Sequence, residues 1–154
     1  MDLRARPRVG VIGAGIANEE VYSLAYEVGR LLGKRGAVVF CGGLGGVMEA
    51  AAKGALEAGA ITVGILPGNK VEEANPYIQI PIVTDMGHAR NVILVRSVEG
   101  VIAVSGGYGT LSEIALALKM WKPVVGLKTW ANIEGVVYTE TPEEAVNTLF
   151  DLLS

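Results

Sequence analysis

The sequence contains little cysteine, histidine or aromatic residue, with one Cys, one His and 6% Phe, Trp and Tyr. The single cysteine, Cys41, cannot form a disulfide within the chain, which is typical of the reducing cytoplasm, so we expect a cytoplasmic protein. We interpret Cys41 as a small core residue rather than a nucleophile. No apolar stretch reaches the roughly 20 residues that span a bilayer. The Asp and His spacings show no metal-site pattern, so we expect no metal.

Positive charge is also scarce. Thirteen basic residues against 16 acidic ones leave a net charge of −3, and no block rich in Lys and Arg follows the N-terminal LRARPR. Proteins that bind nucleic acid or anionic membranes usually present such blocks on a positively charged surface. The composition therefore disfavours nucleic acid and membranes as partners.

Short aliphatic segments are abundant, and apolar residues make up 51% of the chain. β-Branched runs such as RVGVI alternate with segments in which apolar residues recur every third or fourth position, which predicts strands alternating with helices. This order is typical of an α/β fold with a doubly wound, mostly parallel sheet of about seven strands and helices on both faces. The length predicts one domain, residues 1–154. The expected strands are 8–12, 37–41, 62–66, a short one beginning at 82, 100–104, 124–127 and 136–138; the expected helices are 18–34, 47–58, 86–98, 111–120 and 142–153.

Two features lie outside this core pattern. Residues 69–81 are polar, contain two prolines and show no periodicity, so we expect a long loop that forms a rim or lid. In the expected helix 86–98, Val92, Val95 and Val98 lie outside the face that we assign to the core. They could supply a surface for self-association.

Glycine clusters follow three of the expected strands and precede helices. Because the carboxyl ends of parallel strands meet at one edge of the sheet, we expect the three loops to gather there. A helix N-terminus offers free N–H groups, and glycine lets an anion approach them closely, so the clusters predict a phosphate site. The alternative is that glycine only permits tight turns, which one glycine per loop would satisfy. The loops are Gly13-Ala14-Gly15, Gly42-Gly43-Leu44-Gly45-Gly46 and Ser105-Gly106-Gly107-Tyr108-Gly109.

Two common nucleotide-binding signatures are absent. The dinucleotide pattern G-x-G-x-x-G is broken, because Gly13-x-Gly15 is followed by Asn18, and the expected second strand ends without a carboxylate for a ribose. The pattern G-x-x-x-x-G-K-[ST] does not occur either. NAD binding and P-loop ATP hydrolysis are therefore disfavoured, and a mononucleotide or a cofactor with one phosphate or pyrophosphate remains.

Several side chains suited to chemistry lie beside these loops. Thr110 can bind a phosphate or cap a helix. Glu113 can contact a sugar or act on water, unless Thr110 and Glu113 form a T-x-x-E capping box. Arg90 suits bidentate phosphate binding, although a surface arginine is the alternative, and polar Asn91 follows it. We interpret His88 as a loop or helix-start residue.

Longer stretches resemble the LONELY GUY-like (SLOG) superfamily, which also carries the label "possible lysine decarboxylase". They are GGLGGVMEAAAKGALEAG at 42–59, TVGILPG at 62–68, ARN at 89–91 and SGGYGTLSEIALALKMWKPVVGL at 105–127. Residues 106–113 match the family's P-G-G-x-G-T-x-x-E, with Ser105 in place of its Pro. The resemblance covers nearly the whole chain. It implies a Rossmann-like fold and a homodimer or higher homo-oligomer.

Hydrolases of this superfamily remove ribose 5-phosphate from cytokinin nucleoside monophosphates or AMP, and they use an Arg and the motif Glu. The resemblance therefore implies Arg90 and Glu113 as catalytic residues of a nucleoside 5′-monophosphate phosphoribohydrolase, with no required cofactor. The phosphorylated ligand would contact the glycine loops and their flanks. The implied binding residues are Gly13, Gly15, Gly42, Gly43, Gly45, Gly46, Asn91, Ser105, Gly106, Gly107, Tyr108, Gly109 and Thr110.

Two departures keep a second function open. Hydrolase members commonly have Arg-Lys where this chain has Arg90-Asn91, and Pro where it has Ser105. This pattern is more similar to the molybdenum-cofactor carrier proteins, which bind a pterin phosphate without reacting it. The alternative is thus a non-catalytic carrier or sensor of a nucleotide or a molybdopterin-type ligand. Lysine decarboxylation is disfavoured, because no Lys lies in the glycine loops to hold pyridoxal phosphate.

Overall fold

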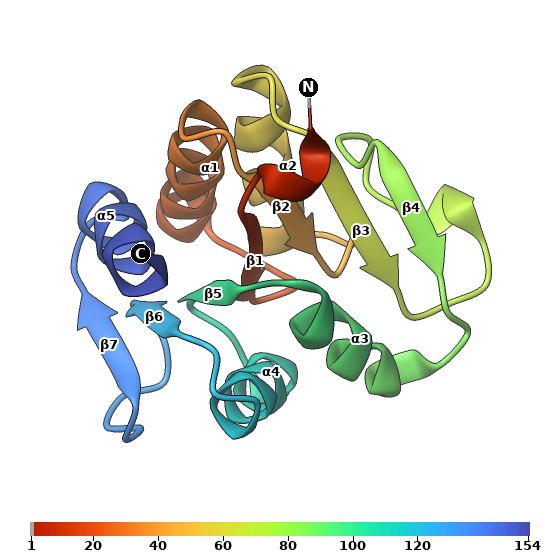
Figure 1. Ribbon diagram of the computed structural model, residues 1–154. Helices are drawn as coiled ribbons and strands as arrows, with labels where there is room; N and C mark the ends of the chain where they lie inside the picture. The colour runs from red at the N-terminus through yellow and green to blue at the C-terminus, as the bar shows by residue number, and fades with distance from the viewer. Residues whose placement is uncertain (1) are drawn as a thin grey trace.

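A parallel sheet of seven strands forms the centre of the protein (Figure 1). The computed structural model describes residues 2–154. The strand order is β4-β3-β2-β1-β5-β6-β7, and every neighbouring pair is parallel. This confirms the predicted α/β, Rossmann-like class. The strands are β1 (Arg8–Gly13), β2 (Val38–Cys41), β3 (Thr62–Leu66), β4 (Ile80–Val83), β5 (Gly100–Val104), β6 (Val124–Leu127) and β7 (Val136–Thr139).

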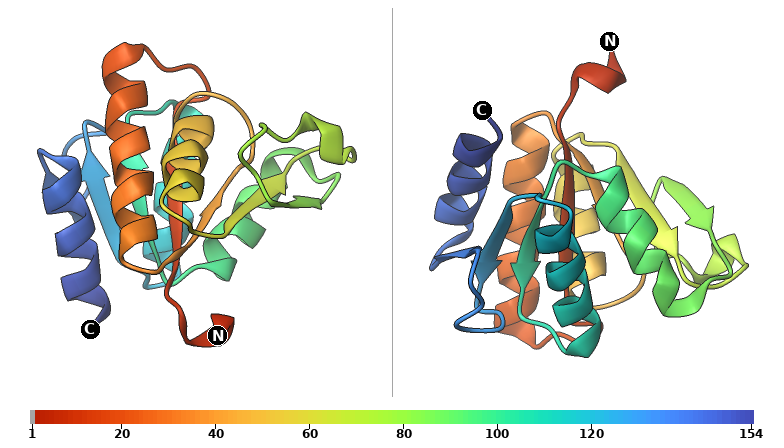
Figure 2. Two further views of the ribbon diagram at one scale, coloured as in Figure 1. Left: turned by 90° about the horizontal axis from the view of Figure 1, so that it is seen from above. Right: turned by 60° about the horizontal axis from the view of Figure 1, so that its bottom comes forward.

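Helices cover both faces of the sheet (Figure 2). One face carries α1 (Glu19–Lys34), α2 (Val47–Glu57) and α5 (Pro142–Leu153), and the other carries α3 (Arg90–Ser97) and α4 (Tyr108–Lys119). Each layer encloses fully buried aliphatic side chains such as Leu32 and Ile114, whose burial contributes about 1.5–3 kcal/mol each. Short 3₁₀ turns lie at Leu3–Ala5, Val71–Glu73 and Gly87–Ala89. Within residues 2–154, no helix combines the length and apolarity needed to cross a bilayer.

The predicted helix starts on the first face are confirmed in detail. Asn18 Oδ1 accepts a hydrogen bond from Val21 N at 2.9 Å, and Thr141 Oγ1 accepts one from Glu144 N at 3.1 Å. Both side chains thus satisfy amides that lack a partner within the helix. Acidic residues follow each cap in the first turn, where the helix dipole favours them.

The strand order reverses between β1 and β5, and this reversal positions the site. From β1 the chain extends the sheet through β2, β3 and β4, then returns so that β5 pairs with the other edge of β1. Gly13 at the end of β1 lies in register with Val104 at the end of β5. The loops that leave these two strands therefore emerge side by side, where open α/β sheets bind ligands.

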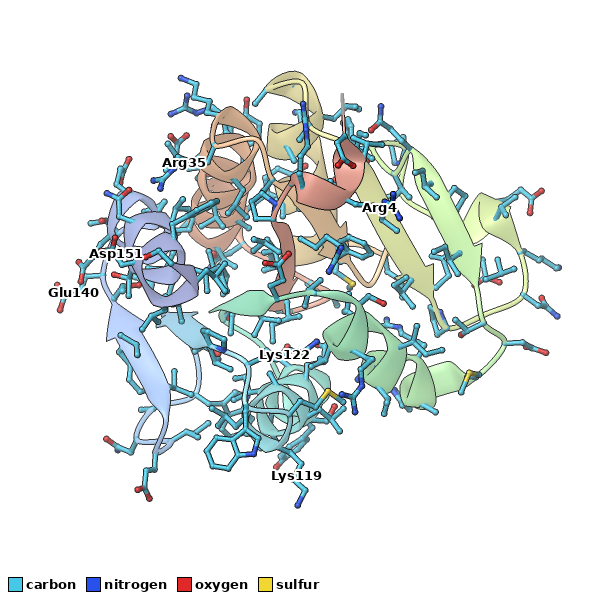
Figure 3. All side chains as sticks on the ribbon, in the orientation of Figure 1. Arg4, Arg35, Lys119, Lys122, Glu140 and Asp151 are labelled. Atoms are coloured by element: carbon cyan, nitrogen blue, oxygen red, sulfur yellow. The ribbon has the colours of Figure 1, made fainter. Side chains whose placement is uncertain are left out.

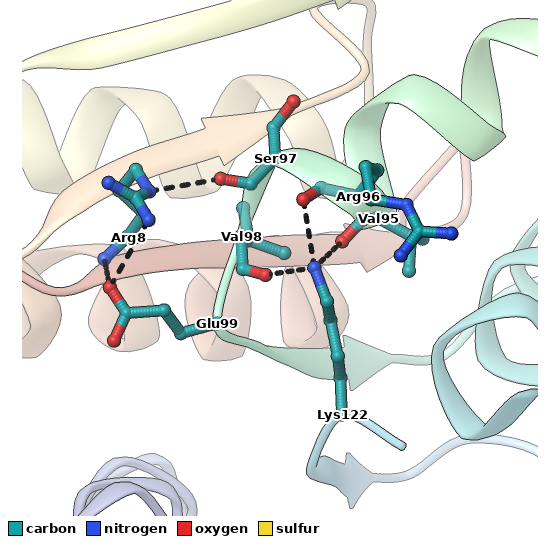
Figure 4. A network of polar contacts seen from close by, with 7 residues as sticks. All are labelled: Arg8, Val95, Arg96, Ser97, Val98, Glu99 and Lys122. Atoms are coloured by element: carbon teal, nitrogen blue, oxygen red, sulfur yellow. Dashed lines mark hydrogen bonds and ion pairs between the residues drawn. The ribbon is translucent and has the colours of Figure 1, made fainter. Parts of the chain in front are cut away.

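Lys122 fixes the C-terminal end of α3 (Figure 4). Its ammonium group donates to three carbonyl oxygens at that helix end, those of Val95 at 2.8 Å, Arg96 at 2.8 Å and Val98 at 2.5 Å. A cation at this end complements both the free carbonyls and the negative pole of the helix. The contact anchors the helix whose first residue is Arg90.

The structure corrects the predicted starts of two helices and one feature that was predicted for each of them. Helix α4 begins at Tyr108 rather than at 111, so Thr110 is its third residue and not its cap. Because Gly107 is the cap residue and no side chain bonds the helix start, the T-x-x-E capping box is wrong. Helix α3 begins at Arg90, later than predicted. The proposed outer face on it is also wrong, since Val95 and Val98 are buried in the core and only Val92 is exposed, at 43%.

Candidate functional site

A cavity of about 260 Å³ lies at the carboxyl edge of the sheet, between the loops that follow β1 and β5. Helices α3 and α4 and the 3₁₀ turn before α3 supply its polar side chains. The predicted long loop, now bounded by β3 and β4, does not line it. The lining residues are Gly13, Ala14, Gly15, Met48, His88, Arg90, Asn91, Gly107, Gly109, Thr110 and Glu113.

Arg90 and Glu113 are the only charged side chains that are buried among residues 2–154, with exposed fractions of 9% and 6%. Other charged groups, such as Arg35, Glu140 and Asp151, point outward at the periphery of the molecule (Figure 3). Burying a charge is unfavourable unless it is paired, so proteins rarely do so without a purpose. Two such residues in one cavity, from two different helices, identify it as the candidate site.

The Arg90 guanidinium is held between three groups. Its Nη1 donates to Asn91 Oδ1 at 2.7 Å and lies 3.8 Å from Glu113 Oε2. On another side it packs against Gly42, where a Cβ would lie 2.7 Å from Nη1, so that this glycine makes room for the guanidinium. Arg90 Nε is the single buried side-chain nitrogen or oxygen in the described chain that has no hydrogen-bond partner. Burial lowers the pKa of Arg90, while Glu113 counteracts this.

Glu113 has no hydrogen-bonded partner in the described part of the chain, and its carboxylate faces Arg90 only across the 3.8 Å ion-pair distance. Burial raises the pKa of Glu113 from 4.5 to about 7, and Arg90 limits the rise. The carboxyl group therefore exchanges its proton near neutral pH, which suits an acid–base role. Burial also raises the pKa of Cys41 to about 12, so this thiol stays protonated, as expected for a core residue.

The first turn of α4 offers unpaired donors to the cavity. The backbone amides of Tyr108, Gly109 and Thr110 have no acceptor within residues 2–154, and no side chain caps this helix. Thr110, whose residue is 3% exposed, also lines the cavity. Together these groups form a positively polarised corner that suits an anion.

In the first turn of α2 the protein itself occupies the first amide, whereas Met48 N and Glu49 N have no acceptor within residues 2–154. Val47 N, the first amide of this helix, donates to Ala14 O at 2.9 Å. A Cβ at Gly46 would lie 2.3 Å from the same carbonyl oxygen, and one at Gly43 would lie 2.6 Å from Leu66 Cδ2. The loop that contains Gly42, Gly43, Gly45 and Gly46 therefore supports the first loop and Arg90 from behind. None of these four predicted binding residues lines the cavity.

Three glycines that line the cavity have room for a side chain. A Cβ at Gly107 or Gly109 would meet no atom within 4 Å, and one at Gly15 would only touch Met48 Cε at 4.0 Å. None of them has the left-handed backbone that favours glycine. In contrast, a Cβ at Gly13 would lie 2.2 Å from Val104 O. Packing therefore explains Gly13 but leaves the other three unexplained.

Three predicted binding residues near α4 do not line the cavity, namely Ser105, Gly106 and Tyr108. Ser105 has φ 55°, and its amide donates to Leu127 O at 3.2 Å. Proline could adopt neither feature, which explains why this chain departs there from the motif that it resembles. Tyr108 is 83% exposed and lies beside the ring of Trp130, at 5.7 Å between centroids.

Sequence reasoning missed three residues that line the cavity: Ala14, Met48 and His88. His88 lies in the 3₁₀ turn before α3, which agrees with its interpretation as a helix-start residue, but it faces the site. Its position two residues before Arg90 was the available signal. Among the described residues, no group of three or more His, Cys, Asp or Glu side chains is arranged to hold a metal ion.

The family model described as SLOG cluster4 matches residues 6–151. The chain belongs to the SLOG cluster4 family. This confirms the resemblance drawn from the glycine motifs, and the match extends over almost all of the sequence.

Relatives of this SLOG protein carry two kinds of name. The chain is 33% identical over 135 residues to a cytokinin riboside 5′-monophosphate phosphoribohydrolase of Mycobacterium tuberculosis, covering 80% of this chain and 71% of that one. It is also similar to the solved molybdenum cofactor binding protein of Rippkaea orientalis, with 36% identity, a TM-score of 0.90 and coverage of 97% and 98%. The molybdenum cofactor carrier protein of Chlamydomonas reinhardtii gives 36% identity, a TM-score of 0.86 and coverage of 96% and 98%.

Proposed function

We propose that the protein binds a phosphorylated, nucleotide-like small molecule in this cavity, with the anionic group against the first turn of α4. The observation that carries the proposal is the bare backbone at Gly15, Gly107 and Gly109, because the fold leaves space for a Cβ at each. Glycines that packing does not require serve the ligand, which can then approach the backbone closely. The unpaired amides of α4 supply the donors that a phosphate group accepts from.

We further propose that the ligand is a nucleoside 5′-monophosphate whose N-glycosidic bond is hydrolysed. Water forms a bond to C1′ of the ribose while the bond from C1′ to the base nitrogen breaks. The products are ribose 5-phosphate and the free base, which takes up the proton that the water loses. The name of the mycobacterial relative supports this reaction class.

Glu113 carries the central role in this hydrolysis. As a carboxylate it stabilises the positive charge that develops at C1′, and it accepts a proton from the attacking water. Its pKa of about 7 makes both protonation states accessible near neutral pH. Arg90, 3.8 Å away, keeps a positive charge beside the carboxylate and so limits its protonation.

A second candidate function is a carrier that binds a nucleotide or molybdopterin-type ligand without reacting it. Two observations favour it. The solved cofactor-binding proteins match this chain over 96% or more of its length, further than the phosphoribohydrolase relative does. In addition, Asn91 stands where the resemblance to hydrolases expects a lysine, so the cavity lacks one positive charge.

One experiment separates the candidates. Purified protein is incubated with AMP and related nucleoside monophosphates, free base is followed by chromatography, and the melting temperature is recorded with and without ligand. Base release that is lost in Glu113→Gln but kept in Glu134→Gln, an exposed carboxylate outside the cavity, supports hydrolysis. A raised melting temperature without base release supports a carrier. If AMP, pyrophosphate and inorganic phosphate all leave the melting temperature unchanged, the proposed phosphate site is wrong.

A further inference from the structure

A chain of three hydrogen bonds runs along the wall of the cavity and connects α3 with α4. Arg90 Nη1 donates to Asn91 Oδ1 at 2.7 Å, and Asn91 Nδ2 donates to Ser112 Oγ at 3.0 Å. The Ser112 hydroxyl then donates to Gly109 O at 2.7 Å, in the first turn of α4. Asn91 is buried, so its amide is held within this chain of contacts.

The direction of these bonds fixes which way the Asn91 amide points. Because Ser112 uses its only proton on Gly109 O, it can offer Asn91 a lone pair but no donor. The Asn91 Nδ2 group must therefore face Ser112, and Oδ1 must face Arg90. A flipped amide would place N–H groups against the guanidinium, donor against donor. Ser112 thus determines the partner that Arg90 meets.

The orientation of the Asn91 amide determines which of two acceptors Arg90 bonds. Nη1 bonds the neutral Asn91 oxygen at 2.7 Å, whereas the Glu113 carboxylate lies at 3.8 Å, beyond hydrogen-bond distance. A hydrogen bond from guanidinium to carboxylate is the stronger interaction in isolation, so the longer contact requires a cause. The competing Asn91 oxygen, aligned by Ser112, provides that cause.

We propose that Asn91 and Ser112 are positioning residues that keep the Arg90 guanidinium from forming a hydrogen-bonded ion pair with Glu113, so that both groups stay open to a ligand. The benefit of this arrangement rests on the proposed function, because it concerns the same cavity. Its test uses the ligand-free protein, however, and can fail or succeed independently of binding and hydrolysis. Ser112 lies outside the cavity lining, and its role is through Asn91 alone.

The test is the titration of Glu113 by carbon NMR in the full chain labelled at glutamate carboxyl carbons. The charged and titratable groups that face Glu113 are Arg90 of α3, Cys41 of β2 and His88 of the preceding 3₁₀ turn. Asn91→Leu removes the competing acceptor and keeps the volume. Arg90 then closes onto Glu113, and the pKa of Glu113 falls by about one unit, since a nearer opposite charge favours the ionised form.

Ser112→Ala gives a milder change in the same direction, because the Asn91 amide loses its alignment, and Ser112→Thr restores the original titration. Ser97→Ala is the matched control. Its hydroxyl also donates to a backbone carbonyl of its own helix, Ile93 O at 2.6 Å, but it lies at the far end of α3. The control leaves the Glu113 titration unchanged, although it loses the same kind of bond.

An unchanged or raised Glu113 pKa in Asn91→Leu overturns the proposal, since removal of a merely structural contact would not draw Arg90 toward the carboxylate. Should Asn91→Leu fail to fold, Ser112→Ala decides in its place. Equal titrations of Glu113 in Ser112→Ala and Ser97→Ala then overturn the proposal. Neither result alters the AMP and phosphate measurements, which test the proposed function.

Discussion

Glu113→Gln should make the protein more stable at alkaline pH and leave its stability unchanged in acid. The substitution replaces a buried carboxylate with a neutral group of the same shape. Glu113 receives no hydrogen bond from the described residues, so the change breaks no short contact. What it removes is the cost of ionising a carboxyl group away from water.

The size and sign follow from the Glu113 titration. Burial raises its pKa from 4.5 to about 7, so between these values the folded protein keeps a proton that the unfolded chain has lost. Stability therefore falls as the pH rises through this window and then levels off above the folded-state pKa. Since one pH unit corresponds to about 1.4 kcal/mol, the ionised carboxylate costs the folded state roughly 3 kcal/mol. Glutamine does not ionise, so the variant has no such cost at any pH.

Urea unfolding of both proteins at about pH 5 and about pH 8 measures the effect. We expect Glu113→Gln to gain roughly 3 kcal/mol at the higher pH and less than about 1 kcal/mol at the lower one. The exposed Glu134→Gln serves as control and should change stability by less than about 0.5 kcal/mol at both. A loss of stability in Glu113→Gln at the higher pH would refute the reasoning, because attraction to Arg90 would then outweigh burial.

Three further substitutions test single contacts by urea unfolding. Lys122→Met keeps the aliphatic stem but leaves the three carbonyls at the end of α3 without their cation, so we expect a loss of about 1–3 kcal/mol. Gly29→Ala would place a Cβ 2.0 Å from Ala51 O and force α1 and α2 apart, with an expected loss of about 1–3 kcal/mol or failure to fold. Gly109→Ala finds open space inside a helix and should gain about 0.5–1 kcal/mol, yet weaken phosphate binding as judged by the ligand-induced rise in melting temperature.

The sequence was sufficient to predict the class of fold because each local signal agreed with the global arrangement. Asn18 and Thr141 mark helix starts through side-chain oxygens that cap them, and the aliphatic runs mark strands buried on both faces.

The start of α4 was predicted three residues late, because Gly107-Tyr108-Gly109 has poor helix propensity. The core face of α3 was misassigned for a different reason. Val95 in α3 and Val98 just after it pack against the sheet. Because α3 begins only at Arg90, the apolar spacing over 86–98 did not show which side chains face the core.

At the site, residue types and motif spacing indicated Arg90 and Glu113, and the structure brings them to 3.8 Å in one cavity. Spacing could not indicate their burial, the unsatisfied Arg90 Nε or the Asn91–Ser112 contact. These depend on how α3 and α4 approach each other across the end of β5. Helix–helix contacts of this kind join residues that are 21 positions apart, and no local pattern encodes them.

The three glycine loops look equivalent in sequence, but they differ in the structure in the space that is available for a Cβ at each glycine. Behind the cavity, a Cβ at Gly42 would clash with the Arg90 guanidinium, and a Cβ at Gly46 would clash with Ala14 O. The first amide of α2, Val47 N, already donates to Ala14 O. At the cavity, Gly107 and Gly109 face open space, and the first amides of α4 remain unbonded. A glycine that a neighbour excludes from carrying a side chain is explained by packing. A glycine with free space beside it has no such explanation, and for this reason we propose that the ligand contacts the backbone of Gly107 and Gly109 at the start of α4.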